Sequence, residues 1–81
     1  MTYIATFYSH FGAIRFKRLC RETDMPAEIM PVPRDLSSSC GSCVRYEGAL
    51  PCPSSRYPDE VEQVVAVTEQ GYRLLYRAEN G

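Results

Sequence analysis

The sequence has almost no excess charge of either sign, because nine lysines and arginines are balanced by ten acidic residues and the net charge is −1. Nonspecific nucleic-acid binding needs a strongly basic surface, so we do not predict this class of function. No apolar run is long enough to cross a bilayer, and we predict no membrane association. No basic segment precedes an apolar one after Met1, so we expect no secretory signal and a cytoplasmic location.

The sequence also lacks internal repeats and low-complexity tracts. Its 81 residues are enough for one modest hydrophobic core, and we expect a single domain over residues 1–81. The apolar fraction of 44% is ordinary for a globular protein, which argues against disorder.

Cysteine is the residue type that suggests chemistry, with Cys20, Cys40, Cys43 and Cys52 present. In a reducing cytoplasm these residues are expected to be thiols, metal ligands or redox groups rather than structural disulfides. Cys40 and Cys43 have the CxxC spacing, which suits a dithiol pair or half of a zinc site. No second pair completes such a site, since Cys20, Cys52 and His10 are not closely spaced, and we predict no metal and no cofactor.

Local patterns predict strands and helices in the order βαββαβ. The expected elements are strands at residues 3–8, 27–32, 43–47 and 72–77, a helix at 10–23, and a second helix that begins at Pro58 and is capped by Gly71. Ser9 is a candidate N-cap of the first helix. The β-branched content of the second helix leaves a hairpin of residues 64–68 against 72–76 as an alternative.

This order predicts an α+β fold of the ferredoxin-like type, a split βαβ sandwich in which a four-stranded antiparallel sheet carries two helices on one face. Three connections would then share one end of the sheet. They are the turn at Ser9 and His10, the loop at 33–43, and the turn at 70–71. We therefore expect His10 and Cys40 at the same end. Exposed sheet edges would permit a homodimer.

The loop that holds Cys40 is the best candidate for a functional site. A reactive thiolate needs positive charge, amide donors or a base nearby. Gly41 allows close backbone approach or a positive φ, and the amides of a Ser/Gly loop can hold an anion. The candidate residues are Cys40, Cys43, His10 and Arg34 for catalysis, and Ser38, Ser39, Gly41 and Arg45 for substrate binding. His10 would act as a base or as a cation.

Several segments of the chain are typical of a known family. They are Ala5-Thr6-Phe7-Tyr8-Ser9, Ile29-Met30-Pro31-Val32-Pro33-Arg34, and Leu36-Ser37-Ser38-Ser39-Cys40-Gly41 followed by Arg45-Tyr46-Glu47. Together they resemble the selenium/sulfur carrier-like family of small bacterial domains. The resemblance implies that Cys40 holds sulfur or selenium as a persulfide or selenosulfide. It also implies that donor and acceptor proteins are the partners, and that Pro33, Arg34, Ser38, Ser39 and Gly41 surround the thiol.

Two alternatives to a carrier remain open. A thiol–disulfide redox or redox-sensing domain would use Cys40 and Cys43 as a reversible pair. A nonenzymatic protein-binding module would use its cysteines structurally. The carrier interpretation makes the chain an accessory protein rather than a stand-alone enzyme.

Overall fold

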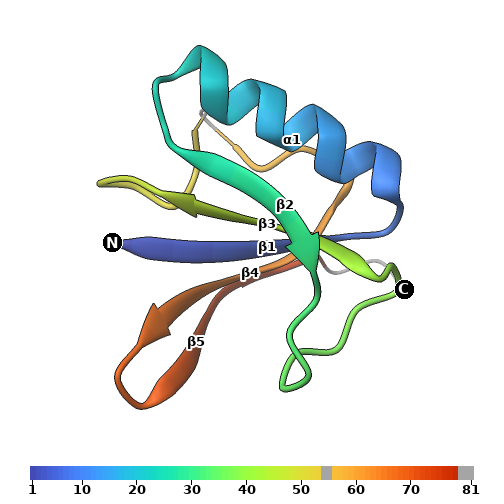
Figure 1. Ribbon diagram of the computed structural model, residues 1–81, viewed down its shortest axis with the longest axis vertical. Coiled ribbons are helices and arrows are strands. Elements are labelled where there is room, and N and C mark those ends of the chain that lie inside the picture. Colours follow the sequence, from blue (N-terminus) through green and yellow to red (C-terminus); the bar gives the residue numbers. More distant parts are fainter. Residues whose placement is uncertain (54–55, 79–81) are drawn as a thin grey trace.

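The computed structural model describes residues 1–53 and 56–78. Within these residues the elements are β1 (Thr2–Phe7), α1 (His10–Glu22), β2 (Ala27–Pro31), β3 (Ser42–Glu47), β4 (Val61–Thr68) and β5 (Gly71–Arg77). The five strands form one sheet in the order β2-β3-β1-β4-β5, and every neighbouring pair is antiparallel (Figure 1). Because β3 lies between β1 and β2, these two strands run parallel and α1 is the crossover that joins them.

The predicted four-stranded sheet with two helices is wrong. The segment expected to be the second helix forms β4 instead, and β4 pairs with β1 on one side and β5 on the other. Its residues are rich in valine, and Val64 and Val65, which point to opposite faces, are both buried. A central strand buried on both faces favours β-branched side chains, and this preference overrides the helical spacing. The alternative hairpin is therefore the one that forms, and it begins earlier, at Val61.

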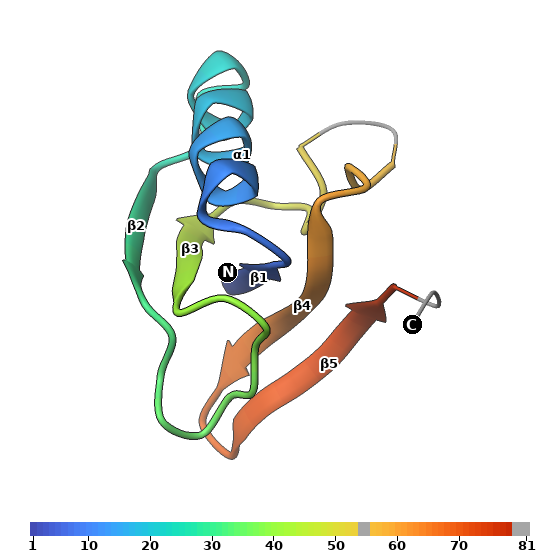
Figure 2. The same ribbon diagram turned by 90° about the vertical axis from the view of Figure 1, so that its right-hand side faces the viewer.

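One face of the sheet is covered by α1 (Figure 2). The helix begins after Ser9, whose hydroxyl accepts a hydrogen bond from the Gly12 N–H at 3.4 Å. Phe16 of α1 lies 5.0 Å from the Tyr46 ring, measured between ring centroids, and is 1% exposed. This face carries the larger core cluster, made of Tyr3, Ala5, Phe7, Ala13, Phe16, Cys20, Val44, Tyr46, Val61, Val64 and Ala66.

The opposite face carries a smaller cluster of Ile4, Cys43 and Val65. Half-buried apolar side chains pack against it, among them Val32 and Leu36 from the connection between β2 and β3. This connection therefore folds over the face of the sheet that α1 leaves open, as Figure 2 shows. Because Cys40 belongs to the same connection, the packing of Val32 and Leu36 holds the cysteine loop against this face of the sheet.

The β1–α1 turn and the β2–β3 loop meet at one end of the sheet. Thr6, near the end of β1, pairs with Cys43 at the start of β3, and Phe7 pairs with Val61 at the start of β4. The third connection expected there, the turn at 70–71, lies at the opposite end. Its position follows from the register, because β4 runs antiparallel to β1. The chain entering β4 occupies the expected place, where the Tyr8 N–H donates to the Glu60 carbonyl at 3.2 Å.

Candidate functional site

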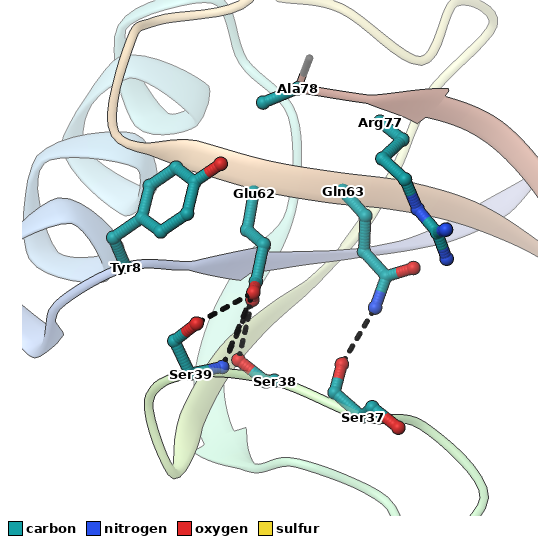
Figure 3. A pocket seen from close by; sticks show the side chains of 8 residues that line it. All are labelled: Tyr8, Ser37, Ser38, Ser39, Glu62, Gln63, Arg77 and Ala78. Carbon is teal, nitrogen blue, oxygen red and sulfur yellow. Dashed lines mark hydrogen bonds between the residues drawn. The ribbon is translucent and has the colours of Figure 1, made fainter. Parts of the chain in front are cut away.

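A carboxylate on β4 holds the loop that contains Cys40. Glu62 accepts hydrogen bonds from the Ser39 hydroxyl at 2.8 Å and from the Ser39 N–H at 3.2 and 3.3 Å (Figure 3). It also accepts from the Ser38 hydroxyl at 3.0 Å and from the Thr6 hydroxyl at 3.2 Å. The two carboxylate oxygens thus connect β4 to the loop and to β1.

The ionisation of Glu62 follows from these contacts. Partial burial by itself raises the pKa of Glu62, but the hydrogen bonds from Ser39, Ser38 and Thr6 together outweigh burial and hold the pKa below its ordinary value. The carboxylate is therefore ionised at neutral pH. The serine-rich loop therefore binds a carboxylate of the protein itself, through the hydroxyls of Ser38 and Ser39 and the Ser39 N–H.

The residue after Glu62 provides a second attachment of the loop. The amide Nε2 of Gln63, which is 7% exposed, donates to the Ser37 carbonyl at 2.7 Å. Two consecutive polar side chains on β4 therefore fix three consecutive serines.

Cys40 is half-buried in this loop and carries a free thiol. Its backbone N–H donates to the Ser38 hydroxyl oxygen at 3.2 Å, and the same hydroxyl donates to Glu62. Ser38 therefore connects the carboxylate to the backbone of Cys40.

His10 reaches the other end of the loop. Its Nδ1 shares a hydrogen bond of 2.9 Å with the Ser42 hydroxyl, two residues after Cys40. The structure thus brings His10 and the cysteine loop to one end of the sheet. Within the described residues, no hydrogen bond joins the imidazole to Cys40 itself.

Cys43 and Cys20 have a different environment from Cys40, because both are 0% exposed. Burial raises the pKa of the Cys43 thiol to about 11, and its Sγ lies 3.7 Å from the Pro31 carbonyl oxygen. Burial, with a smaller contribution from Cys52, raises the pKa of Cys20 to about 11. Both thiols are protonated at neutral pH, so neither is a ready nucleophile.

The two arginines predicted for the site are exposed. Arg34 lies in the β2–β3 loop, whereas Arg45 lies within β3, where it pairs with Ile4 and Glu28. In the described part of the chain, neither arginine forms a hydrogen bond or an ion pair with Cys40.

Gly41 does not have the backbone role that its residue type suggested. The glycine with a positive φ, among those described, is Gly71, and a Cβ added at Gly41 would meet no atom within 4 Å. Its carbonyl accepts from the Val32 N–H at 3.1 Å. The space beside Cys40 at this position is therefore open.

A surface pocket of about 480 Å³ lies beside the loop. Its lining residues are Tyr8, Ser37, Ser38, Ser39, Glu62, Gln63, Arg77 and Ala78, shown in Figure 3. Sequence reasoning missed Glu62 and Gln63, because the helix prediction assigned them no place beside the loop. The signal that could have found them is a polar pair inside a valine-rich strand.

The described residues contain no group of three or more His, Cys, Asp or Glu side chains placed to hold a metal ion. No helix in residues 1–53 and 56–78 has the length and apolar character needed to span a membrane.

The fold and the site define a small α+β protein in which a polar loop over the open face of the sheet carries a half-buried cysteine. Residues 2–50 match the model of the family described as "Putative Se/S carrier protein-like", and the chain belongs to this family. This result confirms the resemblance expected from the sequence segments. Comparisons with curated proteins and with solved structures found no match.

Proposed function

We propose that the protein is a sulfur or selenium carrier in which the Cys40 thiolate holds the transferred atom. One observation carries this proposal. Of the three cysteines inside the family match, Cys20 and Cys43 are buried, whereas Cys40 is half-buried on a polar loop. A transferred atom must enter from a donor and leave to an acceptor, so the carrying sulfur needs access to both.

The transfer steps balance without an external oxidant. The Cys40 thiolate attacks the outer sulfur of a persulfide on the donor, a new S–S bond forms at Cys40, and the donor's S–S bond breaks. The donor leaves as a thiolate, which takes up the persulfide proton when one is present. An acceptor nucleophile then attacks the outer sulfur on Cys40 and releases the Cys40 thiolate. A selenium atom in the outer position follows the same steps.

The surroundings of Cys40 supply the remaining roles in this proposal. His10, held by Ser42 at the end of the loop, is the base or cation near the thiol. Arg34 is an exposed positive charge on the same loop that attracts an anionic persulfide. The open space at Gly41 admits a partner's active site.

The buried position of Cys43 favours a carrier over a redox pair. A reversible disulfide needs both thiols to be reachable and ionisable, and burial raises the pKa of Cys43 to about 11. In this proposal Cys43 is a core residue, and Arg45, which pairs with Ile4 and Glu28 within β3, is an exposed surface charge.

The test is sulfur loading followed by nonreducing peptide mapping. The protein is incubated with a cysteine desulfurase and either cysteine or selenocysteine, or with polysulfide, so that the donor already carries the transferred atom bonded to sulfur. We expect a mass gain of one sulfur or selenium atom on Cys40 in the wild type, in Cys43→Ser and in Cys52→Ser, and none in Cys40→Ser. Cys52→Ser is the matched control, because Cys52 is also half-buried.

Three results would contradict the proposal. The first is that no donor produces a mass gain on Cys40. The second is that the mass gain of the protein persists in Cys40→Ser. The third is a Cys40–Cys43 disulfide that cycles reversibly in the wild type and whose loss in Cys43→Ser abolishes loading, since this would favour the redox alternative.

A further inference from the structure

Ser38 sits between a carboxylate and the backbone of the proposed carrier cysteine. Its hydroxyl donates to Glu62 Oε1 at 3.0 Å and accepts from the Cys40 N–H at 3.2 Å. A hydroxyl has one hydrogen to donate, so the orientation that serves Glu62 leaves an oxygen lone pair for Cys40. The Phe7 carbonyl is a second acceptor within reach of this hydroxyl, but at 3.5 Å it is farther away than the Glu62 oxygen at 3.0 Å.

The donor set around Glu62 suits an ionised carboxylate. Three hydroxyls and one backbone N–H converge on its two oxygens, and an ionised carboxylate only accepts. Hydrogen bonds to a charged acceptor are stronger than those between neutral groups. Among the residues that the structure describes, no hydrogen bond between backbone groups involves residues 38–40, and the charged Glu62 side chain on β4 binds both Ser38 and Ser39.

We propose that Glu62 is a positioning residue for Cys40 and that it acts through Ser38. This inference rests on the proposed function, since it assigns to Glu62 the placement of the sulfur that carries the transferred atom. Glu62 lies on β4, outside the matched residues 2–50, so the family match does not assign it a role.

The proposal predicts two separate effects when the carboxylate is removed. The Cys40 amide loses the hydroxyl that held it, so its hydrogen exchanges faster. Cys40 also loses its fixed placement, so loading from a protein donor slows, because a donor's active site requires a defined position of the attacking sulfur. Alkylation by small iodoacetamide needs no such placement and is not slowed.

The experiment is a double-mutant cycle on the full chain, with Glu62→Ala, Ser38→Ala and the double variant. The readouts are amide hydrogen exchange at Cys40 and the rate of sulfur loading from a desulfurase. We expect the Cys40 amide hydrogen to exchange about fivefold faster than wild type in each single variant. In the double variant it should exchange no faster than in either single variant, since both substitutions remove the same connection. Ser38→Thr keeps the hydroxyl and should restore slow exchange and loading.

Glu69→Ala is the matched control, because Glu69 is an exposed carboxylate at the opposite end of the sheet. Exchange of the Ala5 amide, in the central strand, reports whether each variant stays folded. If Glu62→Ala does not fold, Glu62→Gln keeps the side-chain length and removes the charge. We then expect smaller effects in the same direction.

Full additivity of the two single variants would overturn the proposal, and so would unchanged Cys40 exchange in Glu62→Ala. Failure of the carrier function itself looks different. In that case the wild type does not load sulfur while the coupling of Glu62 and Ser38 in hydrogen exchange remains. A structural effect alone would speed exchange of Ala5 and Cys40 together, and this result also counts against the proposal.

Discussion

The Ser39 hydroxyl donates to the Glu62 carboxylate at 2.8 Å, and the two residues are 23 positions apart in the chain. This bond joins the cysteine loop to β4, which pairs with β1 on one side and β5 on the other. The position of Cys40 therefore depends on a part of the chain that lies outside the family match.

The first prediction concerns acid stability. The folded pKa of Glu62 is below its ordinary value of 4.5, so the folded state binds the proton less readily than the unfolded state. Ionised Glu62 therefore stabilises the fold above pH 4.5, and this contribution is lost as the pH falls through the folded pKa. We expect Glu62→Gln to lower the free energy of unfolding by about 1–3 kcal/mol at pH 7, and by less at lower pH.

Urea denaturation of both proteins from pH 3 to pH 7 measures this difference. Asp59→Asn, which changes an exposed carboxylate just before β4, is the control and should show no such trend. A difference between wild type and Glu62→Gln that stays constant over this pH range would contradict the assignment of charge to Glu62.

The second prediction concerns the order in which the thiols react. Cys20 and Cys43 are buried, and burial is the main cause that raises the pKa of each to about 11. At pH 7.5 both are protonated and shielded, so iodoacetamide should modify Cys40 at least about tenfold faster than either of them. Peptide mass spectrometry after timed alkylation measures the rates, and the same reaction in urea should remove the difference. Equal native rates at Cys40 and Cys43 would show that β3 opens easily.

The sequence predicted the first half of the fold well because its signals there are local. Ser9 precedes a helix with an apolar face, and the β-branched and aromatic content of β1 and β3 matches strands that other strands flank on both sides. The second half failed where two local signals conflicted. Val61, Val64 and Val65 fit helical spacing and β propensity equally, and pairing with β1 decided between them.

The candidate site was predictable only in part for the same reason. The Ser-Cys-Gly loop and the approach of His10 follow from the order of the first elements. The role of Glu62 could not be inferred, because it depends on a strand that was assigned as a helix. The burial of Cys43 follows from alternation in β3, which places it on the face that the loop covers.

The third prediction concerns His10 and its bond to Ser42. Both side chains meet at the surface, so His10→Ala should cost less than about 1 kcal/mol of stability. If the imidazole assists Cys40, sulfur loading in the variant should slow by about tenfold or more. Ser42→Ala keeps the imidazole but removes its hydrogen-bond partner, and we expect a smaller loss of rate. Loading within twofold of wild type in both variants would show that His10 has no part in the transfer.

The fourth prediction concerns Gly12, in the first turn of α1. An added Cβ would lie 2.7 Å from the Glu60 Cβ and 3.3 Å from the Phe7 ring, so Gly12→Ala forces α1 and the chain entering β4 apart. We expect a loss of about 1–3 kcal/mol, although alanine is usually the better helix former. Urea denaturation of the variant and the wild type measures this loss in the free energy of unfolding. A gain in stability would mean that the chain entering β4 moves aside at little cost.

The fifth prediction concerns Gly41, which follows Cys40 and, unlike Gly12, has free space around it. An added Cβ would meet no atom within 4 Å and φ is not positive, so Gly41→Ala should change stability by less than about 0.5 kcal/mol. The open space matters only when a partner's active site closes on the loop. We therefore expect slower loading from a desulfurase and an unchanged rate with polysulfide, both followed by the mass gain on Cys40. Equal slowing with both donors would place the effect in the loop itself, and no slowing with either would show that the partner does not approach Cys40 over Gly41.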